Sequence, residues 1–221
     1  MSKKQFVVIG LGRFGEVIAK TIYDLGQDVL VIDKDEDKVN DIADCVTHAV
    51  QMDVTDENDL KKLGLSNFDV GVVSIGSDIQ ASVMTTLLMK EMGVNYVIAK
   101  GQSDLHAKVL YKIGADKVIL PEKDMGKRVA YNLVSSNVLD YIQLSSEYSI
   151  LEIESLKSWN EKSLKELDLR KKYGINVVAI KDGTNINVSP GADEIIKPND
   201  IIVALGSTED LKKFKNALRK N

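Results

Sequence analysis

The sequence predicts an α/β fold with a doubly wound parallel sheet, followed by a small α+β domain. Two observations predict the first part: short apolar strands alternate with amphipathic helices, and a glycine-rich turn separates the first strand from the first helix. A third observation predicts the second part, because the regular alternation is lost in the last third of the chain. We therefore expect a Rossmann-type domain with its connecting helix at residues 1–137 and a C-terminal domain at residues 138–221.

The elements of the first domain follow from the spacing of its apolar residues. Short apolar runs indicate buried strands, and apolar residues repeated every three or four positions indicate helices that cover a sheet. On these grounds we expect strands at residues 5–9, 28–33, 48–51, 68–75, 95–100 and 117–120, and helices at residues 16–25, 36–43, 57–63, 80–92 and 103–113.

The second part of the chain is predicted to start after a long connecting helix. Apolar residues repeat at helical spacing over residues 123–142, from Met125 to Ile142. Asp182 and Gly183 indicate a turn between two strands. We expect strands at residues 149–153, 175–180, 186–188 and 201–205, and helices at residues 161–167 and 208–218.

Composition narrows the class of protein. Among 221 residues, 44% are hydrophobic and 28% are charged, which is ordinary for folded domains and argues against a disordered chain. The net charge is -4 without a stripe of Lys or Arg, so a nucleic-acid partner is disfavoured. The single cysteine, Cys45, excludes an internal disulfide, and we find no secretory signal or membrane-spanning run. We expect a cytoplasmic protein.

The glycine turn predicts a nucleotide site. Gly10, Gly12 and Gly15 form a G-x-G-x-x-G pattern directly after the first strand and at the start of the first helix. Gly10 allows the tight turn, Gly12 lets the backbone approach a pyrophosphate, and Gly15 lets the helix pack closely on the strand. The helix start offers free N–H groups to anionic oxygens.

Asp33 supports this interpretation. It ends the second strand, near the separation of roughly 20 residues at which a carboxylate accepts hydrogen bonds from a ribose diol. A carboxylate there repels a 2′-phosphate, so NADP is disfavoured. The alternative is that Asp33 caps the following helix, because Asp is a favoured N-cap residue.

Further candidates follow the carboxyl ends of other strands, where parallel sheets form their ligand crevice. Asp53 follows the third strand, and residues 74–77 follow the fourth. For Asp53 two roles stay open, a contact to the ligand and the start of the next helix. Arg13 lies inside the glycine turn and is expected to bind a terminal phosphate, rather than to be a solvated surface residue.

Groups for catalysis are not found in the sequence. His48 is predicted to be structural, whereas His106 has two open roles, a ligand contact and a solvated residue at a helix start. No Ser-His-Asp, Cys-His or metal-binding spacing accompanies them. We therefore expect a nucleotide sensor rather than an enzyme. The main alternative is an NAD-dependent oxidoreductase, and a methyltransferase that uses S-adenosylmethionine is a third.

Four segments carry a resemblance to a known family. Residues 8–15, 74–82, 113–116 and 121–126 read VIGLGRFG, SIGSDIQAS, IGAD and PEKDMG. Together they resemble the cytosolic RCK (KTN) regulatory subunits of Ktr and Trk potassium transporters, essentially from end to end. The resemblance implies paired subunits that form a homo-octameric ring under a membrane-embedded potassium-translocating subunit, where they act as a peripheral component at the inner face of the membrane.

The resemblance also implies ligands. ATP would activate and ADP inactivate, and NAD(H) is a further ligand of the family. Arg13 would contact the terminal phosphate and Asp33 the ribose. The remaining pocket residues that the resemblance implies are Phe14, Lys34, Asp35, Asp53, Val54, Ile75, Gly76, Ser77, Lys100, Gly101, Gln102 and His106.

Two further sites are implied by the resemblance alone. Glu122 would share a divalent or monovalent cation with the phosphates, although an acidic residue in the first turn of a helix is also favourable without a ligand. In the C-terminal domain, cyclic di-AMP would be held by Arg170, Ile175, Asn176 and Pro190. From the residues alone we would interpret Arg170 as part of a solvated helix face and Ile175 as core.

Overall fold

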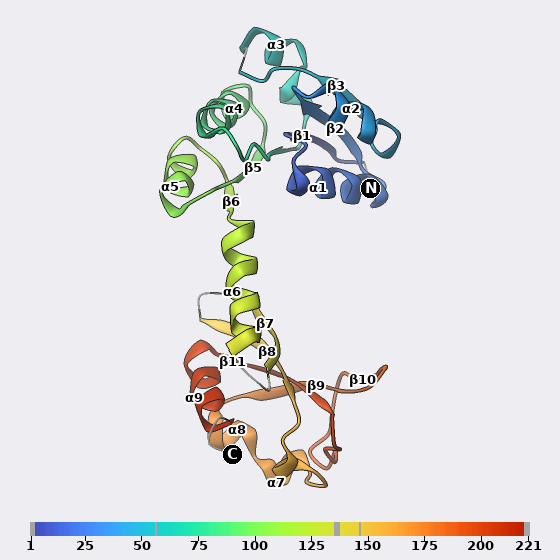
Figure 1. Ribbon diagram of the computed structural model, residues 1–221, viewed down its shortest axis with the longest axis vertical. Coiled ribbons are helices and arrows are strands. Elements are labelled where there is room, and N and C mark those ends of the chain that lie inside the picture. Colours follow the sequence, from blue (N-terminus) through green and yellow to red (C-terminus); the bar gives the residue numbers. More distant parts are fainter. Residues whose placement is uncertain (1–2, 56, 135–137, 146, 219–221) are drawn as a thin grey trace. The chain divides into compact units, whose positions relative to one another are not determined.

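The computed structural model describes residues 3–218 apart from residues 56, 135–137 and 146. The chain divides into two compact units, Met1–Glu122 and Lys123–Asn221 (Figure 1). Helix α6 (Pro121–Val134) begins in the first unit and continues in the second. Each unit has its own sheet and its own hydrophobic core.

The first unit is an α/β sandwich built on a parallel sheet. In the described residues the strand order is β3-β2-β1-β4-β5-β6, and each of these pairings is parallel. The strands are β1 (Gln5–Ile9), β2 (Asp28–Asp33), β3 (His48–Gln51), β4 (Val70–Val73), β5 (Tyr96–Lys100) and β6 (Lys117–Ile119). The helical segments are α1 (Arg13–Asp24), α2 (Glu36–Ile42), η1 (Ala43–Cys45), α3 (Glu57–Lys62), η2 (Leu65–Asn67), α4 (Ile79–Glu91) and α5 (Asp104–Lys112).

Alternating side chains of the central strands enter two separate cores, one on each face of the sheet. Val8 lies in one core, together with residues of α1 and α2. Val7 and Ile9 lie in the other core, together with residues of α3, α4 and α5. Strands that are buried on both faces read as continuous apolar runs, which explains why the sequence pattern located them.

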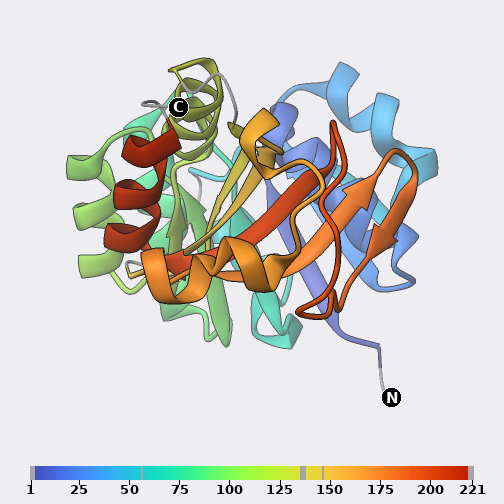
Figure 2. The same ribbon diagram turned by 90° about the horizontal axis from the view of Figure 1, so that it is seen from below.

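The second unit is an α+β domain with an antiparallel sheet. Among the described residues its strand order is β10-β9-β11-β8-β7. The strands are β7 (Val138–Gln143), β8 (Tyr148–Glu154), β9 (Asn176–Asp182), β10 (Asn185–Asn187) and β11 (Ile201–Ser207). The helical segments are η3 (Lys157–Trp159), α7 (Leu164–Leu167), α8 (Leu169–Tyr173) and α9 (Thr208–Leu218). In both views the β9–β10 hairpin lies on one side of this unit and α9 on the other (Figure 1 and Figure 2).

Aromatic residues form the centre of the second core. The ring of Phe214, which is 1% exposed, packs against the rings of Trp159 and Tyr173, with centroid distances of 5.9 and 5.1 Å. Leu151 and Ile153 of β8 are fully buried in the same core. This core therefore joins α8, α9 and η3 to one face of the sheet.

One predicted element was wrong in part. The helix expected over residues 123–142 ends at Val134, and Val138–Gln143 forms strand β7. Its residues pair with β8, for example Val138 with Ile153 and Ile142 with Ile150. A short segment with apolar residues fits both periodicities, and here pairing with the neighbouring strand decides. The domain boundary after residue 137 stays a prediction, and residues 135–137 lie outside the described residues.

Two smaller differences concern the second unit. The helix expected at residues 161–167 begins only at Leu164, because Ser163 is its N-cap. Helix α8 was not expected as a separate element. Asp168, with a φ of 47°, separates it from α7, and Gly174, with a φ of 72°, ends it.

Candidate nucleotide-binding site

The glycine turn has the geometry that its sequence predicts. Gly10 has a φ of 95°, which disfavours residues with a Cβ, and its N–H donates to the Ile32 carbonyl at 2.8 Å. A Cβ on Gly15 would lie 2.0 Å from the Gly10 oxygen and 3.0 Å from the Ser74 side chain. Glycine at position 15 therefore lets α1 lie close to the turn after β1 and to Ser74 at the end of β4.

Helix α1 begins without a side-chain cap. Its N-cap residue is Gly12, which has no side chain to accept a hydrogen bond, and a Cβ placed there would meet no atom within 4 Å. The first N–H groups of a helix have no acceptor within the helix and carry part of its positive dipole. The start of α1 is thus open to an anionic group.

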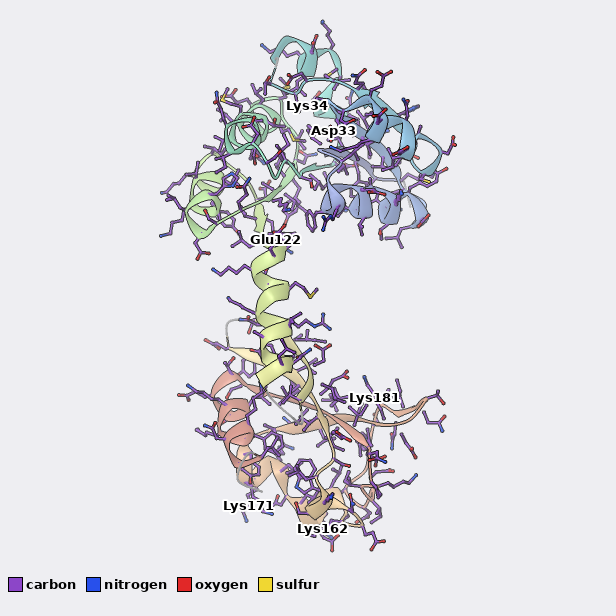
Figure 3. All side chains as sticks on the ribbon, in the orientation of Figure 1. Asp33, Lys34, Glu122, Lys162, Lys171 and Lys181 are labelled. Carbon is purple, nitrogen blue, oxygen red and sulfur yellow. The ribbon has the colours of Figure 1, made fainter. Side chains whose placement is uncertain are left out.

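Asp33 links this turn to the end of β2. Its Oδ2 accepts a hydrogen bond from the Leu11 N–H at 2.6 Å, and its Oδ1 accepts one from the Asp35 N–H at 2.9 Å. Asp35, and not Asp33, is the N-cap residue of α2, with its side chain accepting from the Asp37 N–H. The helix-cap interpretation of Asp33 was therefore wrong. Asp33 and Lys34 are labelled side by side at the end of β2 (Figure 3).

Arg13 and Phe14 form the first two positions of α1. The Arg13 side chain is exposed, and that of Phe14 is half-buried. An exposed guanidinium at an uncapped helix start is accessible to a bound phosphate. The position of Arg13 is compatible with the predicted phosphate contact.

Asp53 follows β3 and forms a turn of its own. Its Oδ1 accepts hydrogen bonds from the N–H and the Oγ1 of Thr55, at 3.0 and 2.8 Å. These bonds, first of all the one from the backbone of Thr55, lower the pKa of the Asp53 carboxyl. Helix α3 begins only at Glu57. The neighbouring Val54 is buried in the core beneath the sheet edge.

The segment after β4 borders the glycine turn. Ser74 is 4% exposed, its N–H donates to the Ile9 carbonyl at 2.7 Å, and its Oγ has no hydrogen-bond partner among the described residues. Ile75 packs against the core. The Gly76 carbonyl accepts a hydrogen bond from the Gln102 side chain, which joins the segments that follow β4 and β5. Ser77 is exposed in the same segment.

His106 lies at the start of α5 but is not solvated. It is 3% exposed, its Nδ1 accepts from the Gln102 N–H at 3.3 Å, and its Nε2 is unpartnered within the described part of the chain. Burial lowers the pKa of the imidazole, which favours its neutral form. The alternative of a solvated histidine was wrong. Gly101 is also buried, and a Cβ there would lie 2.9 Å from Leu120.

Lys100 and Glu122 form an ion pair at the same edge of the sheet. Lys100 ends β5, and Glu122, labelled in Figure 3, is in the first turn of α6. The Lys100 Nζ lies 2.7 Å from the Glu122 Oε1. The Lys100 ammonium lowers the pKa of the Glu122 carboxyl. The described residues contain no cluster of three or more His, Cys, Asp or Glu side chains that could hold a metal ion. The cation role of Glu122 stays a prediction.

The four residues expected to bind cyclic di-AMP lie in different environments. Arg170 in α8 and Asn176 at the start of β9 are exposed, and Pro190 is half-buried. Ile175 is 1% exposed and packs on Gly206, where a Cβ would lie 2.9 Å from its Cγ2. The structure thus places Ile175 in the core, as the residue pattern by itself suggested.

Sequence reasoning missed the contacts that join these residues. The Leu11 N–H is bound by Asp33, and Gln102 binds the Gly76 carbonyl, yet neither partnership has a signal in the sequence. Both depend on which strand ends lie next to each other. The predicted residues at the ends of β1, β2, β4 and β5 are brought to one edge of the parallel sheet.

The fold and this edge define a Rossmann-type α/β unit followed by a small antiparallel α+β unit. Comparison with known proteins identifies the family. The TrkA-N domain model matches residues 6–121, and the TrkA-C domain model matches residues 150–219. The chain belongs to the family of Ktr system potassium uptake proteins of the A and C type, which combine TrkA-N and TrkA-C (RCK) domains.

Two relatives from Bacillus subtilis (strain 168) show the extent of the similarity. The chain is 52% identical to Ktr system potassium uptake protein C over 96% of both chains. It is 47% identical to Ktr system potassium uptake protein A, over 98% of this chain and 97% of the relative. The family consists of regulatory subunits, so the alternatives of an oxidoreductase and a methyltransferase are not supported.

A solved structure shows the same fold. The GsuK channel bound to NAD matches 95% of this chain with a TM-score of 0.68 at 12% identity, and this chain spans 38% of the length of that channel. Within the described residues, no helix is both long and apolar enough to span a bilayer.

Proposed function

We propose that the chain is a cytosolic regulatory subunit that gates a membrane potassium transporter in response to an adenine nucleotide. The observation that carries the proposal is the uncapped start of α1, which lies beside a carboxylate at the end of β2. This edge of the sheet favours a ligand with its phosphates at Gly12 and its ribose at Asp33. ATP and ADP are the proposed ligands, and NAD(H) fits the same features.

Asp33 can hold a ribose without releasing the glycine turn. Each of its oxygens accepts one backbone N–H, from Leu11 and from Asp35. A carboxylate oxygen has about two lone-pair sites, so each oxygen keeps one for a sugar hydroxyl. Asp33 would then both fix the backbone of the turn and bind the ribose.

Arg13 is proposed to distinguish ATP from ADP. The two nucleotides share the ribose and the first two phosphates, so only contacts at the terminal phosphate can favour one conformation over another. Arg13 is exposed at the helix start and can bind such a phosphate bidentately. A cation at Glu122, if one binds, would need its other ligands from the nucleotide or from another chain.

The second unit is proposed to bind cyclic di-AMP, with Arg170, Asn176 and Pro190 at its surface. Ile175 would contribute only if the adjoining core rearranged, because it is 1% exposed. We further propose that pairs of chains assemble into an octameric ring on a membrane-embedded potassium-translocating subunit, at the inner face of the membrane. The similarity to Ktr system potassium uptake proteins supports the association with a transporter.

Calorimetric titration with ATP, ADP and NADH tests the first part. The unmodified chain should bind ATP and ADP, and Arg13→Ala should weaken ATP by roughly tenfold, the loss expected for a charged hydrogen bond, and ADP by less. Lys20→Ala is the matched control, since Lys20 is an exposed cation on the same helix that pairs with Glu16. If the unmodified chain binds none of the three ligands, or if Arg13→Ala weakens ATP and ADP equally, the corresponding step of the proposal is wrong.

A further inference from the structure

The Lys100–Glu122 pair joins the edge of the sheet to the start of α6. Lys100 is the last residue of β5, and its side chain is 16% exposed. The Glu122 side chain is 72% exposed. The Lys100 side chain is therefore largely covered by the protein, whereas the Glu122 carboxylate is accessible to solvent.

Lys100 also borders the segment after β4. A Cβ on Gly76 would lie 3.5 Å from the Lys100 Nζ, so the ammonium lies beside a residue with no side chain to cover it. Among the described residues, Glu122 is the acceptor found for this ammonium, which has three N–H donors. The Lys100 ammonium therefore keeps N–H donors that a further acceptor can use.

We propose that the Lys100–Glu122 pair is a ligand-sensitive contact, in which the phosphate oxygens of a bound nucleotide compete with Glu122 for the Lys100 ammonium. This inference rests on the proposed nucleotide binding at the same sheet edge and adds its regulation. Lys100 is the cation that changes partner, and Glu122 is the internal competitor that a phosphate must replace. Phosphate is a suitable competitor because it is a dianion with several acceptor oxygens.

The competition has a consequence for α6. Glu122 lies in the first turn of this helix, and the residues from Lys123 onward belong to the second unit. Without a ligand, the pair ties this first turn to β5. When Lys100 turns to a phosphate, that tie is lost, and the nucleotide changes the stability of the helix that leads to the second unit. The effect needs no contact between the ligand and the second unit.

The competition can be measured as a double-mutant cycle in ADP affinity, in EDTA so that no divalent cation takes part. Lys100→Met should weaken ADP by roughly tenfold, because a charged phosphate contact is lost. Glu122→Gln should tighten ADP by about threefold, because the competing exposed ion pair is removed. In the Lys100→Met background, Glu122→Gln should have no effect.

The cycle separates this inference from simpler explanations. A gain from Glu122→Gln that persists without Lys100 would show general repulsion of phosphate and would overturn the competition. Unchanged or weaker ADP binding by Glu122→Gln alone would also overturn it. If the unmodified chain bound no ADP, the proposed function itself would fail, which is a different result from normal binding with no coupling.

Hydrogen exchange over residues 121–130 provides the second measurement. ADP should increase exchange in this segment of the unmodified chain, and Lys100→Met should show the increased exchange already without ADP. Lys90→Met is the matched control, because Lys90 forms a lysine–aspartate pair with Asp116 at 2.9 Å in the same unit. The control should leave the ADP effect on residues 121–130 intact. Unchanged or decreased exchange on ADP binding in the unmodified chain would contradict the inference.

Discussion

The start of α7 in the second unit and the start of α1 in the first unit differ in how they are capped. In the second unit, Ser163 and Glu166 form a capping box at α7, with hydrogen bonds at 3.2 and 2.7 Å. In the first unit, α2, α4 and α5 are capped by acidic or hydroxyl side chains, but α1 begins at Gly12 without one. Helix α8 of the second unit also starts without a side-chain cap, but the start of α1 lies beside the Asp33 carboxylate at the end of β2. This combination supports the proposed nucleotide site at α1.

The two sheets differ in a related way. The parallel sheet is covered by helices on both faces, so its polar residues gather at the strand ends. In the antiparallel sheet, Asp140 of β7 and Glu152 of β8 are paired directly opposite each other within the sheet. Arg128 of α6 binds Asp140, and Lys181 binds Glu152 at 2.6 Å, so each acid has its own cation. These acidic side chains are thus paired with cations of the second unit itself.

Phe214→Ala should have the largest effect on stability, and this effect should be confined to the second unit. Removing a fully buried aromatic ring costs about 3–5 kcal/mol in the free energy of unfolding. Because Phe214 belongs to the second core, ADP binding by the first unit should remain. Urea unfolding and calorimetry on the same preparation measure both properties. Loss of ADP binding together with intact first-unit structure would show that the units are not independent.

Gly15→Ala and Gly12→Ala test the glycine turn. The added Cβ at position 15 would lie 2.0 Å from the Gly10 oxygen, and we expect a loss of about 3 kcal/mol in stability, as for severe overpacking. At position 12 it would meet nothing within 4 Å, so stability should change by less than roughly 0.5 kcal/mol. Gly12→Ala should instead weaken ADP. Equal effects of the two variants on unfolding would contradict these roles.

Ser163→Ala removes a cap that is satisfied within the fold. We expect a cost of about 1 kcal/mol in the stability of the second unit, the usual value for a lost N-cap. Ser163→Thr is the matched control, because its hydroxyl can still accept from the Glu166 N–H. Chemical unfolding followed in the second unit measures the difference. An alanine variant as stable as the threonine variant would show that the capping box contributes nothing.

Acid should weaken the second unit through Asp140. The hydrogen bond from Arg128 is the main cause that lowers the pKa of this carboxyl below its ordinary value of 3.8. A lowered folded-state pKa stabilises the fold above the ordinary value, and this contribution is lost as the pH falls from 3.8 through the folded-state pKa. Asp140→Asn should lack this loss. The free energies of unfolding of the unmodified chain and of Asp140→Asn should therefore differ above pH 3.8 and approach each other as the pH falls below it. A difference that stays constant with pH would contradict this prediction.

Much of the first unit could be predicted from the sequence. Strands β1 and β2 were placed with their observed bounds, because strands buried on both faces leave continuous apolar runs. Gly10, Gly12 and Gly15 were assigned separate roles, and the structure agrees with the turn role of Gly10 and the packing role of Gly15. The ligand role of Gly12 stays a prediction.

The second unit was harder to predict. Residues 138–142 were assigned to a helix because Val138 and Ile142 are four positions apart, yet they form β7 beside β8. Periodicity over a few residues cannot separate the two states when a neighbouring strand supplies the hydrogen bonds. Likewise, the family resemblance suggested a ligand contact for Ile175, which the fold buries.

The sequence by itself determined the alternation of strands and helices, the glycine turn and the family, since these depend on residue types at fixed spacing along the chain. Only the tertiary structure decided that Asp33 binds the Leu11 N–H, that His106 is buried, and that Lys100 pairs with Glu122. Each of these facts joins residues from different elements. Their distance in space is set by the order of strands in the sheet, which local sequence patterns do not encode.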